Sequence, residues 1–209
     1  ITGEYPYVYL DGLYLKRSWG GEVRPVAILV AIGVSSDGHR EILGVAEGAK
    51  EDEESWTGFL RHLKERGLKG VQLFTSDKCV GLVNALGAAF PGAMWQRCIV
   101  HFYRNVFTAV PNGKMRKVTR MLKAIHAQED RKEAARKAEA VAAKLENMRL
   151  AKAAKIVRND RAALMAVASF SRSRRAQNRQ SWSWKRRNFA KMRVPGTYTY
   201  DLYGFDAGT

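Results

Sequence analysis

The chain has 209 residues, of which 46% are hydrophobic and 27% are charged, a balance typical of a globular protein rather than a disordered one. Its 36 lysines and arginines against 20 acids give a formal net charge of +16, which indicates a polyanionic partner, most often nucleic acid. The two cysteines exclude a disulfide framework, and no apolar run reaches the roughly 20 residues of a membrane helix or resembles a signal peptide.

Three strands are predicted within the first fifty residues. Residues 7–10 form a short β-rich run that ends at Asp11, and residues 26–34 form a nearly continuous apolar stretch, as expected of a strand buried on both faces. The Asp37-Gly38 pair between two apolar runs predicts a hairpin, with residues 41–46 as the returning strand. We expect these three strands to be antiparallel.

The hydrophobic spacing changes to that of a helix after residue 52. Trp56, Phe59, Leu60 and Leu63 recur at intervals of three and four residues, which predicts an amphipathic helix that ends near Gly67. Strands and helices then alternate: strand 71–74, helix 82–90, strand 94–96 and helix 100–110. This order predicts an α/β fold with a mixed, ribonuclease-H-like sheet, in which three antiparallel strands precede parallel crossovers; a doubly wound sheet would alternate from the start.

Three regions are predicted along the chain. Residues 1–112 form the α/β core. Residues 113–170 form an all-helical insertion, since the segment is rich in Ala, Lys, Arg and Glu and has no proline or glycine after residue 113. Residues 171–209 form a basic tail without apolar periodicity, which either contacts DNA or is poorly folded.

Two aspartates follow predicted strands. Asp11 ends the first strand and Asp77 follows the fourth, and in a ribonuclease-H-like order these two strands lie side by side, so the carboxylates would converge. Clustered carboxylates suit Mg²⁺ or Mn²⁺, and phosphodiester cleavage by two metal ions needs such a cluster. The alternative is turn chemistry, because Asp-Gly and Ser-Asp pairs commonly begin loops.

A series of short strings occurs in order along the chain: YLDG at 9–12, WGG at 19–21, EILGV at 41–45, EDE at 51–53 followed by Trp56, SD at 76–77, GL at 81–82 and WQRCIVHFYRN at 95–105. Together they resemble the mutator-type transposases of bacterial insertion sequences. The resemblance runs from about Tyr5 to Phe170. It implies a chain without the N-terminal DNA-binding domain of such transposases.

This resemblance implies a catalytic core with an Asp-Asp-Glu triad that binds two Mg²⁺ or Mn²⁺ ions. Such enzymes cut DNA at the transposon ends and join the freed ends to target DNA. Asp11 and Asp77 match the first two acids, so we expect them to be catalytic residues and metal ligands. The partners implied are transposon and target DNA and further copies of the chain, with no membrane, in a bacterial cytoplasm near the nucleoid.

Cys98 and His101 match a Cys-x-x-His signature of this family whose role is open. A structural zinc site usually takes four ligands, so a packed cysteine with a hydrogen-bonded histidine is favoured over a composite zinc site that includes Cys79. Arg97 and Arg104, in the same string, are predicted to contact DNA phosphates.

The third acid of the family should follow the insertion, and it is missing from that place. Only Asp201 and Asp206 remain near the end, in no matching context, while Glu146 and Asp160 come too early, inside the insertion. We interpret the sequence from about Ser171 as a shifted reading frame or a rearranged end. Three functions therefore remain open: a transposase core that is active or once was, another ribonuclease-H-like nuclease, and a non-catalytic basic DNA-binding remnant.

Overall fold

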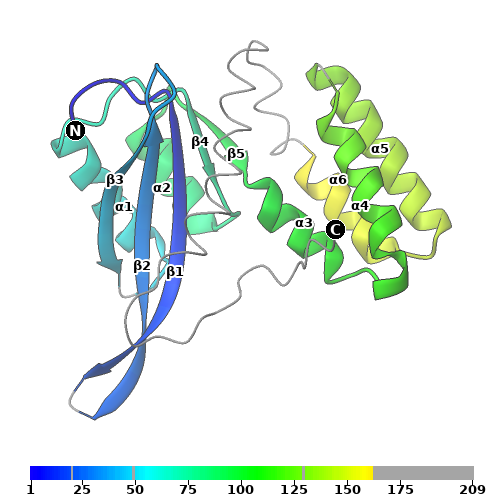
Figure 1. Cartoon of the computed structure of the whole chain (residues 1–209), viewed down its shortest axis with the longest axis horizontal. Coiled ribbons are helices and arrows are strands. Elements are labelled where there is room, and N and C mark those ends of the chain that lie inside the picture. The colour runs from blue at the N-terminus through cyan, green and yellow to red at the C-terminus, as the bar shows by residue number, and fades with distance from the viewer. Residues whose placement is uncertain (20, 49, 129, 162–209) are drawn as a thin grey trace.

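The computed structural model describes residues 1–19, 21–48, 50–128 and 130–161. An α/β part and a helical part lie beside each other, with helix α3 leading from one to the other (Figure 1). The predicted tail over residues 171–209 and the end of the predicted insertion lie outside the described residues. Among the residues described, no helix is long and apolar enough to cross a membrane.

The five strands of the described residues form one mixed sheet in the order β3-β2-β1-β4-β5. They are β1 (Tyr7–Trp19), β2 (Glu22–Val34), β3 (Arg40–Gly48), β4 (Leu73–Ser76) and β5 (Met94–Arg97). The first three pair antiparallel, β4 is parallel to β1, and β5 is parallel to β4. The predicted mixed sheet, with antiparallel strands first and parallel strands second, is confirmed.

Strand β1 is longer than the sequence predicted. We expected it to end at Asp11, but it continues for eight more residues and pairs with β2 along its whole length, with Asp11 opposite Val30. The hairpin closes tightly at Gly21, whose φ of +85° lies in the left-handed region that glycine tolerates. Asp11 therefore lies inside a strand, where the pleat fixes the direction of its side chain.

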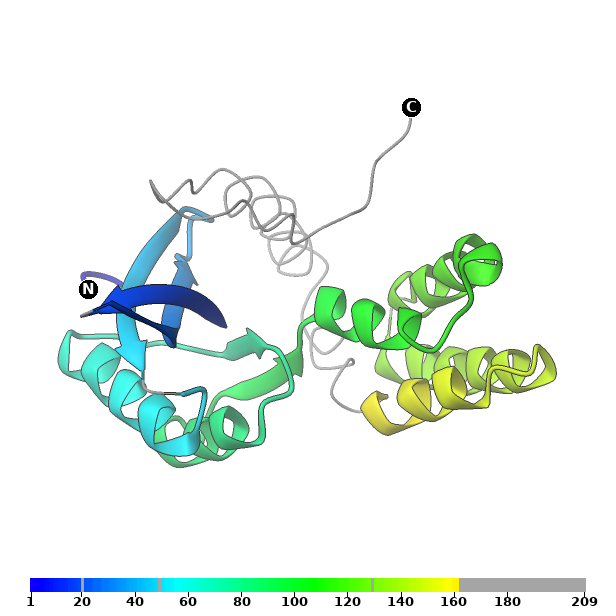
Figure 2. The same cartoon turned by 90° about the horizontal axis from the view of Figure 1, so that it is seen from below.

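Helices α1 (Glu53–Glu65) and α2 (Val80–Ala89) lie on the same side of the sheet, as Figure 2 shows. Helix α1 begins at Asp52, whose carboxylate accepts a hydrogen bond from the Ser55 amide. The four predicted apolar residues of α1 are all buried, and they pack in one cluster with residues of β1, β2, β4 and α2. The predicted amphipathic helix is thus confirmed.

Four further helices follow: α3 (Ile99–Phe107), α4 (Asn112–His126), α5 (Arg131–Asn147) and α6 (Ala151–Asp160). The last three lie in the region predicted as a helical insertion. The hydrophobic core of this helical part also takes in Phe102 and Val106 of α3, ahead of the predicted boundary at residue 113. Helix α3 therefore packs into the core of the helical part.

His126 is buried inside the helical part, beside the rings of Phe102 and Tyr103. Its Nε2 atom has no hydrogen-bond partner among the described residues. Burial lowers the pKa of His126 from its ordinary 6.5 to about 4, because the charged form loses its hydration there. Protonation of His126 therefore opposes folding.

We predict that acid destabilises the wild-type chain more than a His126→Leu variant. The folded pKa is lowered, so the unfolded chain binds the proton first and stability falls as the pH drops from 6.5 toward 4. The gap between the two pKa values corresponds to about 3 kcal/mol. Urea unfolding at pH 7, 5.5 and 4.5 measures it, with the exposed His62→Leu as the control. An identical pH dependence in wild type and His126→Leu would contradict the prediction.

Candidate active site

Asp11 and Asp77 stand at equivalent places on neighbouring strands. In the parallel pairing of β1 with β4, Tyr9 lies opposite Thr75, and each aspartate comes two residues after its strand's member of that pair. Asp11 lies inside β1 and Asp77 is the first residue after β4, so this register brings the two aspartates to the same edge of the strand pair. Both line one half-open cavity of about 150 Å³.

The cavity combines an apolar base with a polar rim. Leu10, Trp56 and Leu82 of the main hydrophobic core contribute apolar surface. The polar side chains that line the cavity are Asp11, Glu51, Asp77, Cys79, His101 and Arg104. The structure therefore brings together two predicted aspartates, the predicted histidine and one of the two predicted arginines.

Glu51 is a third carboxylate in this cavity, and the sequence analysis assigned it no role. Its carboxylate lies against the backbone of Gly12, where an added Cβ would come within 1.9 Å of Glu51 Oε1. Burial raises the pKa of Glu51, and the charges of Asp11 and Asp77 raise it further. No hydrogen bond or ion pair to this carboxylate occurs among the described residues.

The loop that carries Glu51 is tied to the start of α2. The Cys79 thiol donates a hydrogen bond of 3.2 Å to the Glu51 carbonyl oxygen. The sequence signal was the acidic string at residues 51–53, which contains Glu51 immediately ahead of the Asp52 cap. Nothing in that string predicts that its first acid lies beside residues 11 and 77.

His101 lies in the first turn of α3 and faces the cavity. Burial alone lowers the pKa of His101, but a side-chain hydrogen bond with Cys98, together with the charges of Cys98, Asp11 and Asp77, raises it above the ordinary value overall. Cys98 is buried at the N-terminal end of the helix. The two cysteines thus make different contacts, Cys98 with His101 and Cys79 with the backbone of residue 51.

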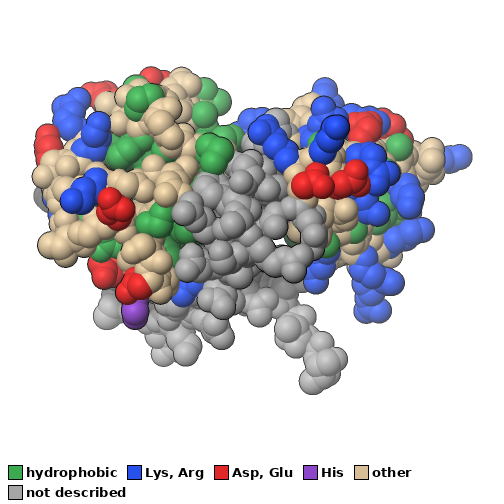
Figure 3. All heavy atoms as spheres, turned by 90° about the horizontal axis from the view of Figure 1, so that it is seen from above, with side chains coloured by type: hydrophobic (Ala, Val, Ile, Leu, Met, Phe, Trp, Pro, Cys, Tyr) green, Lys and Arg blue, Asp and Glu red, His purple; other side chains and the backbone are tan. Residues whose placement is uncertain are grey.

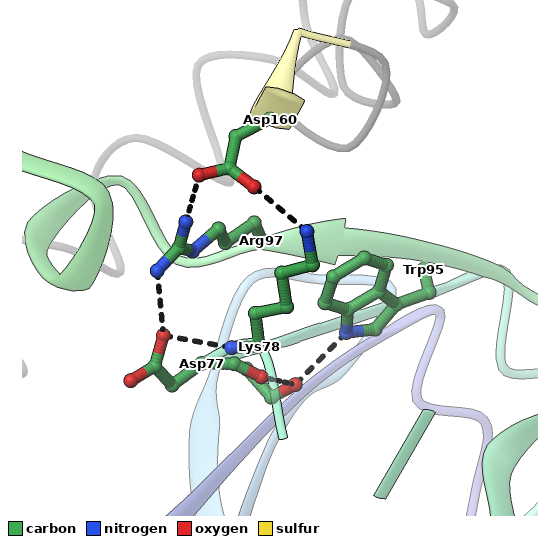
Figure 4. A network of polar contacts seen from close by, with 6 residues as sticks. Asp77, Lys78, Trp95, Arg97 and Asp160 are labelled. Carbon is green, nitrogen blue, oxygen red and sulfur yellow. Dashed lines mark hydrogen bonds and ion pairs between the residues drawn. The ribbon is translucent and has the colours of Figure 1, made fainter. Parts of the chain in front are cut away.

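The two predicted arginines have different surroundings. Arg104 is exposed and lines the cavity. Arg97, at the end of β5, is only 3% exposed, and its guanidinium lies between the carboxylates of Asp160 and Asp77 (Figure 4). The prediction that Arg97 contacts DNA assumed a surface position, so the burial of its side chain corrects that assumption and leaves Arg104 as the candidate phosphate contact.

The other acids considered for the third catalytic position lie elsewhere. Asp160 is 3% exposed and is bound by Arg97 and by the Lys78 ammonium at 3.0 Å (Figure 4). Glu146 forms an ion pair with Arg158 within the helical part. Asp201 and Asp206 lie outside the described residues.

We predict that Glu51→Gln raises the stability of the metal-free chain at pH 7. The pKa of Glu51 is raised on folding, so ionisation of its carboxyl group opposes folding. The stability that the protonated carboxyl contributes below its unfolded pKa is lost as the pH rises through the folded pKa. The gain should therefore shrink as the pH approaches 4. Thermal unfolding in EDTA at pH 4, 5.5 and 7 measures this.

The exposed Glu54→Gln on the same segment is the matched control for that measurement. It should not share the gain at pH 7. A Glu51→Gln variant that is no more stable than Glu54→Gln at pH 7 would show that ionised Glu51 does not oppose folding.

Curated relatives of this chain are transposases of bacterial insertion sequences. It is 43% identical over 121 residues to the transposase of insertion sequence IS256 in transposon Tn4001 from Staphylococcus aureus, covering 58% of this chain and 31% of the relative. It is 43% identical over 129 residues to the transposase of IS1081 from Mycobacterium tuberculosis, covering 62% of this chain and 31% of the relative. The aligned part thus spans about a third of these relatives' length.

Solved structures with some likeness include a bovine immunodeficiency virus (BIV) integrase catalytic core domain, with 13% identity and a TM-score of 0.29 over 71% of this chain and 79% of that one. A chain of the simian T-cell lymphotropic virus intasome in complex with a PP2A regulatory subunit has 11% identity and a TM-score of 0.31. That likeness covers 46% of this chain and 34% of the other.

The family model described as transposase, Mutator family, matches residues 1–186. The match continues past Phe170, where we expected the resemblance to end. Because it covers most of the chain, the chain belongs to the Mutator family of transposases.

Proposed function

We propose that this chain carries the catalytic core of a DNA transposase, which cleaves transposon ends and joins them to target DNA with divalent metal. The observation that carries the proposal is the placement of Asp11 and Asp77 at equivalent points of adjacent parallel strands, opening on one cavity. The sheet order, with an antiparallel hairpin beside parallel crossovers, supports a ribonuclease-H-like fold. Action on two transposon ends calls for more than one copy, so the proposal includes a homo-oligomer.

The donor set of the cavity fits a hard divalent cation. Asp11, Asp77 and Glu51 supply carboxylate oxygens, the ligands that Mg²⁺ and Mn²⁺ prefer. Burial, and after it the charges of Asp11 and Asp77, raise the pKa of Glu51, and a bound cation would relieve the repulsion among the three carboxylates. No three His, Cys, Asp or Glu side chains of the described residues are placed to hold an ion as they stand. We assign Asp11 and Asp77 as ligands and Glu51 as the third carboxylate that lines the same cavity.

Bound divalent ions would stabilise the attacking and leaving oxygens of the phosphodiester. The residues of this chain supply the surroundings of that reaction. Arg104 at the rim would hold a phosphate, since guanidinium groups pair with phosphate oxygens in two-pronged fashion. His101 lines the same cavity, and its side-chain hydrogen bond with Cys98 and the charges of Cys98, Asp11 and Asp77 outweigh burial and raise its pKa.

Helix α4 offers a surface for the DNA backbone. It carries no acid and has five exposed cations: Lys114, Arg116, Lys117, Arg120 and Lys123. No ion pair to an acid involves them within the described part of the chain, whereas α5 and α6 pair several cations with their own acids, as at Arg136–Glu133 and Arg158–Glu139. Lysine and arginine side chains gather over the helical part in Figure 3. Cations without acidic neighbours are available to phosphates.

A second candidate function is non-catalytic DNA binding by the same fold. It is favoured by one observation: no Asp or Glu occurs between residues 161 and 200, where the third acid of the family would be expected. Under this function, the charge on α4 and the fold remain while strand cleavage is lost.

We predict that the chain nicks supercoiled plasmid in Mn²⁺ at low salt and that Asp11→Asn or Asp77→Asn lowers the rate by about 100-fold or more, since even residues that only support metal ligands cost 10–100-fold. Asp130→Asn is the matched control, because Asn caps α5 as Asp does. Absence of nicking by the wild type, with the plasmid still retarded on a gel, would instead support the non-catalytic function.

We predict that replacing Arg116, Arg120 and Lys123 by Gln weakens DNA binding and its salt dependence together. Removing one phosphate contact should reduce the slope of log K against log salt by about 0.9, so removing three should change it by about 2.7. Fluorescence anisotropy with duplex DNA between 50 and 300 mM salt measures the slope. A triple Gln variant of Lys132, Lys137 and Lys144 on α5 removes the same charge. An equal change in both variants would assign the effect to net charge rather than to α4.

A further inference from the structure

A buried ion pair joins the helical part of the molecule to the edge of the sheet. Arg97 ends β5, and Asp160 ends α6, 63 residues further along the chain. The two side chains are 4% and 5% exposed, and the Arg97 Nη1 atom donates to the Asp160 carboxylate (Figure 4). The Lys78 ammonium adds a second cation to Asp160 at 3.0 Å.

The buried charges of Arg97 and Asp160 each require the other as an ion-pair partner. A buried ion without its partner costs several kcal/mol, whereas two well-packed apolar residues in place of such a pair are often as stable. Stability alone therefore does not account for a buried arginine and aspartate at this place. What distinguishes the pair is its other neighbour, since the Nη2 atom of Arg97 lies 3.4 Å from Oδ1 of Asp77.

The two carboxylate oxygens of Asp77 have different surroundings. Its Oδ1 atom accepts hydrogen bonds from Arg97 Nη2 at 3.4 Å and from the Lys78 amide at 2.7 Å. Its carbonyl oxygen accepts from the Ser76 hydroxyl at 2.8 Å, and that hydroxyl accepts from the Trp95 indole (Figure 4). Neither described contact uses Oδ2, so one carboxylate oxygen is fixed while the second is left for a ligand in the cavity.

We propose that Arg97 and Asp160 form a latch by which the helical part positions the Asp77 carboxylate. Asp160 orients the guanidinium, and the guanidinium orients Oδ1 of Asp77, so that Oδ2 points into the cavity. Arg97 and Asp160 are positioning residues in this arrangement. The inference rests on the proposed function only for the identity of the ligand on Oδ2, which is a divalent cation.

The alternative role of the pair is purely structural, as a tie between the two parts. The two roles separate in the double variant Arg97→Met/Asp160→Leu, which replaces the pair by apolar side chains and leaves no unpaired buried charge. Apolar packing in the double variant can replace a purely structural contact between the two parts. It cannot replace a hydrogen bond that orients Asp77.

The experiment compares the full-length wild type, this double variant and Asp160→Asn by thermal unfolding, calorimetric titration with Mn²⁺ and amide hydrogen exchange. The Lys78 amide is the informative group, since it donates to Oδ1 of Asp77. We expect the double variant to unfold near the wild-type temperature, to bind Mn²⁺ 10–100-fold more weakly, as for other residues that support ligands, and to exchange the Lys78 amide faster. Wild-type Mn²⁺ affinity and wild-type exchange at Lys78 in the double variant would overturn the latch.

Arg158→Met is the matched control, because Arg158 lies on the same helix and pairs with Glu139 and Glu146 away from the cavity. It should lower the unfolding temperature and leave exchange at Lys78 unchanged. If the double variant fails to fold, Asp160→Asn carries the same test, since it keeps the shape of the side chain, removes its charge and leaves Asp77 as the acid paired with Arg97. Hydrogen exchange needs no metal and no DNA. A wild type that binds no Mn²⁺ would therefore contradict the proposed function, while exchange at Lys78 still decides the latch.

Discussion

The parallel pairing of β1 with β4 is the contact on which the rest of the molecule depends. It places two strands that are more than sixty residues apart in sequence side by side, and it sets their register so that Asp11 and Asp77 project into one cavity. A shift of one residue would turn either carboxylate to the opposite face of the sheet. The packing of α1 and α2 over Leu10 and Phe74 fixes this register, because the apolar residues of both strands are buried there.

The same pairing has an electrostatic consequence. Three carboxylates line a small cavity, and the pKa of Glu51 is raised there by burial first and by the charges of Asp11 and Asp77 second. Part of the compensation comes from the protein, through Arg97 next to Asp77. The arrangement suits a site that must attract a cation, since full neutralisation by the protein would remove that attraction.

The sequence predicted those features that depend on local pattern. Helical spacing identified α1, the Asp37-Gly38 turn identified the hairpin between β2 and β3, and the element order predicted a mixed sheet. The predicted end of β1 was wrong because the Asp11-Gly12 pair is typical of a turn, whereas the strand continues through it by pairing with β2. Local pattern could not predict the position of Glu51, since its neighbours in the cavity come from three other segments.

Arg97 illustrates the same limit more sharply. Arginine side chains are mostly exposed, so the sequence predicted a surface position for Arg97. Its buried ion-pair partner Asp160 lies 63 residues further along the chain, in a region for which the sequence predicts only helices. Asp160 was set aside as a catalytic acid because of its place in the chain, and the structure gives a physical reason for the same outcome, since two cations already bind its carboxylate.

Helix α3 and the Arg97–Asp160 pair connect the two parts of the molecule at separate points. His101 and Arg104, three residues apart on α3, face the cavity, while Phe102 and Val106, four residues apart, belong to the core of the helical part. One short helix therefore belongs to both parts, and the ion pair adds a connection from the far end of α6. These two connections attach the helical part to His101 and to Arg97. Because His101 lines the cavity and Arg97 contacts Asp77, the DNA contacts proposed for α4 would have a physical route to the cavity.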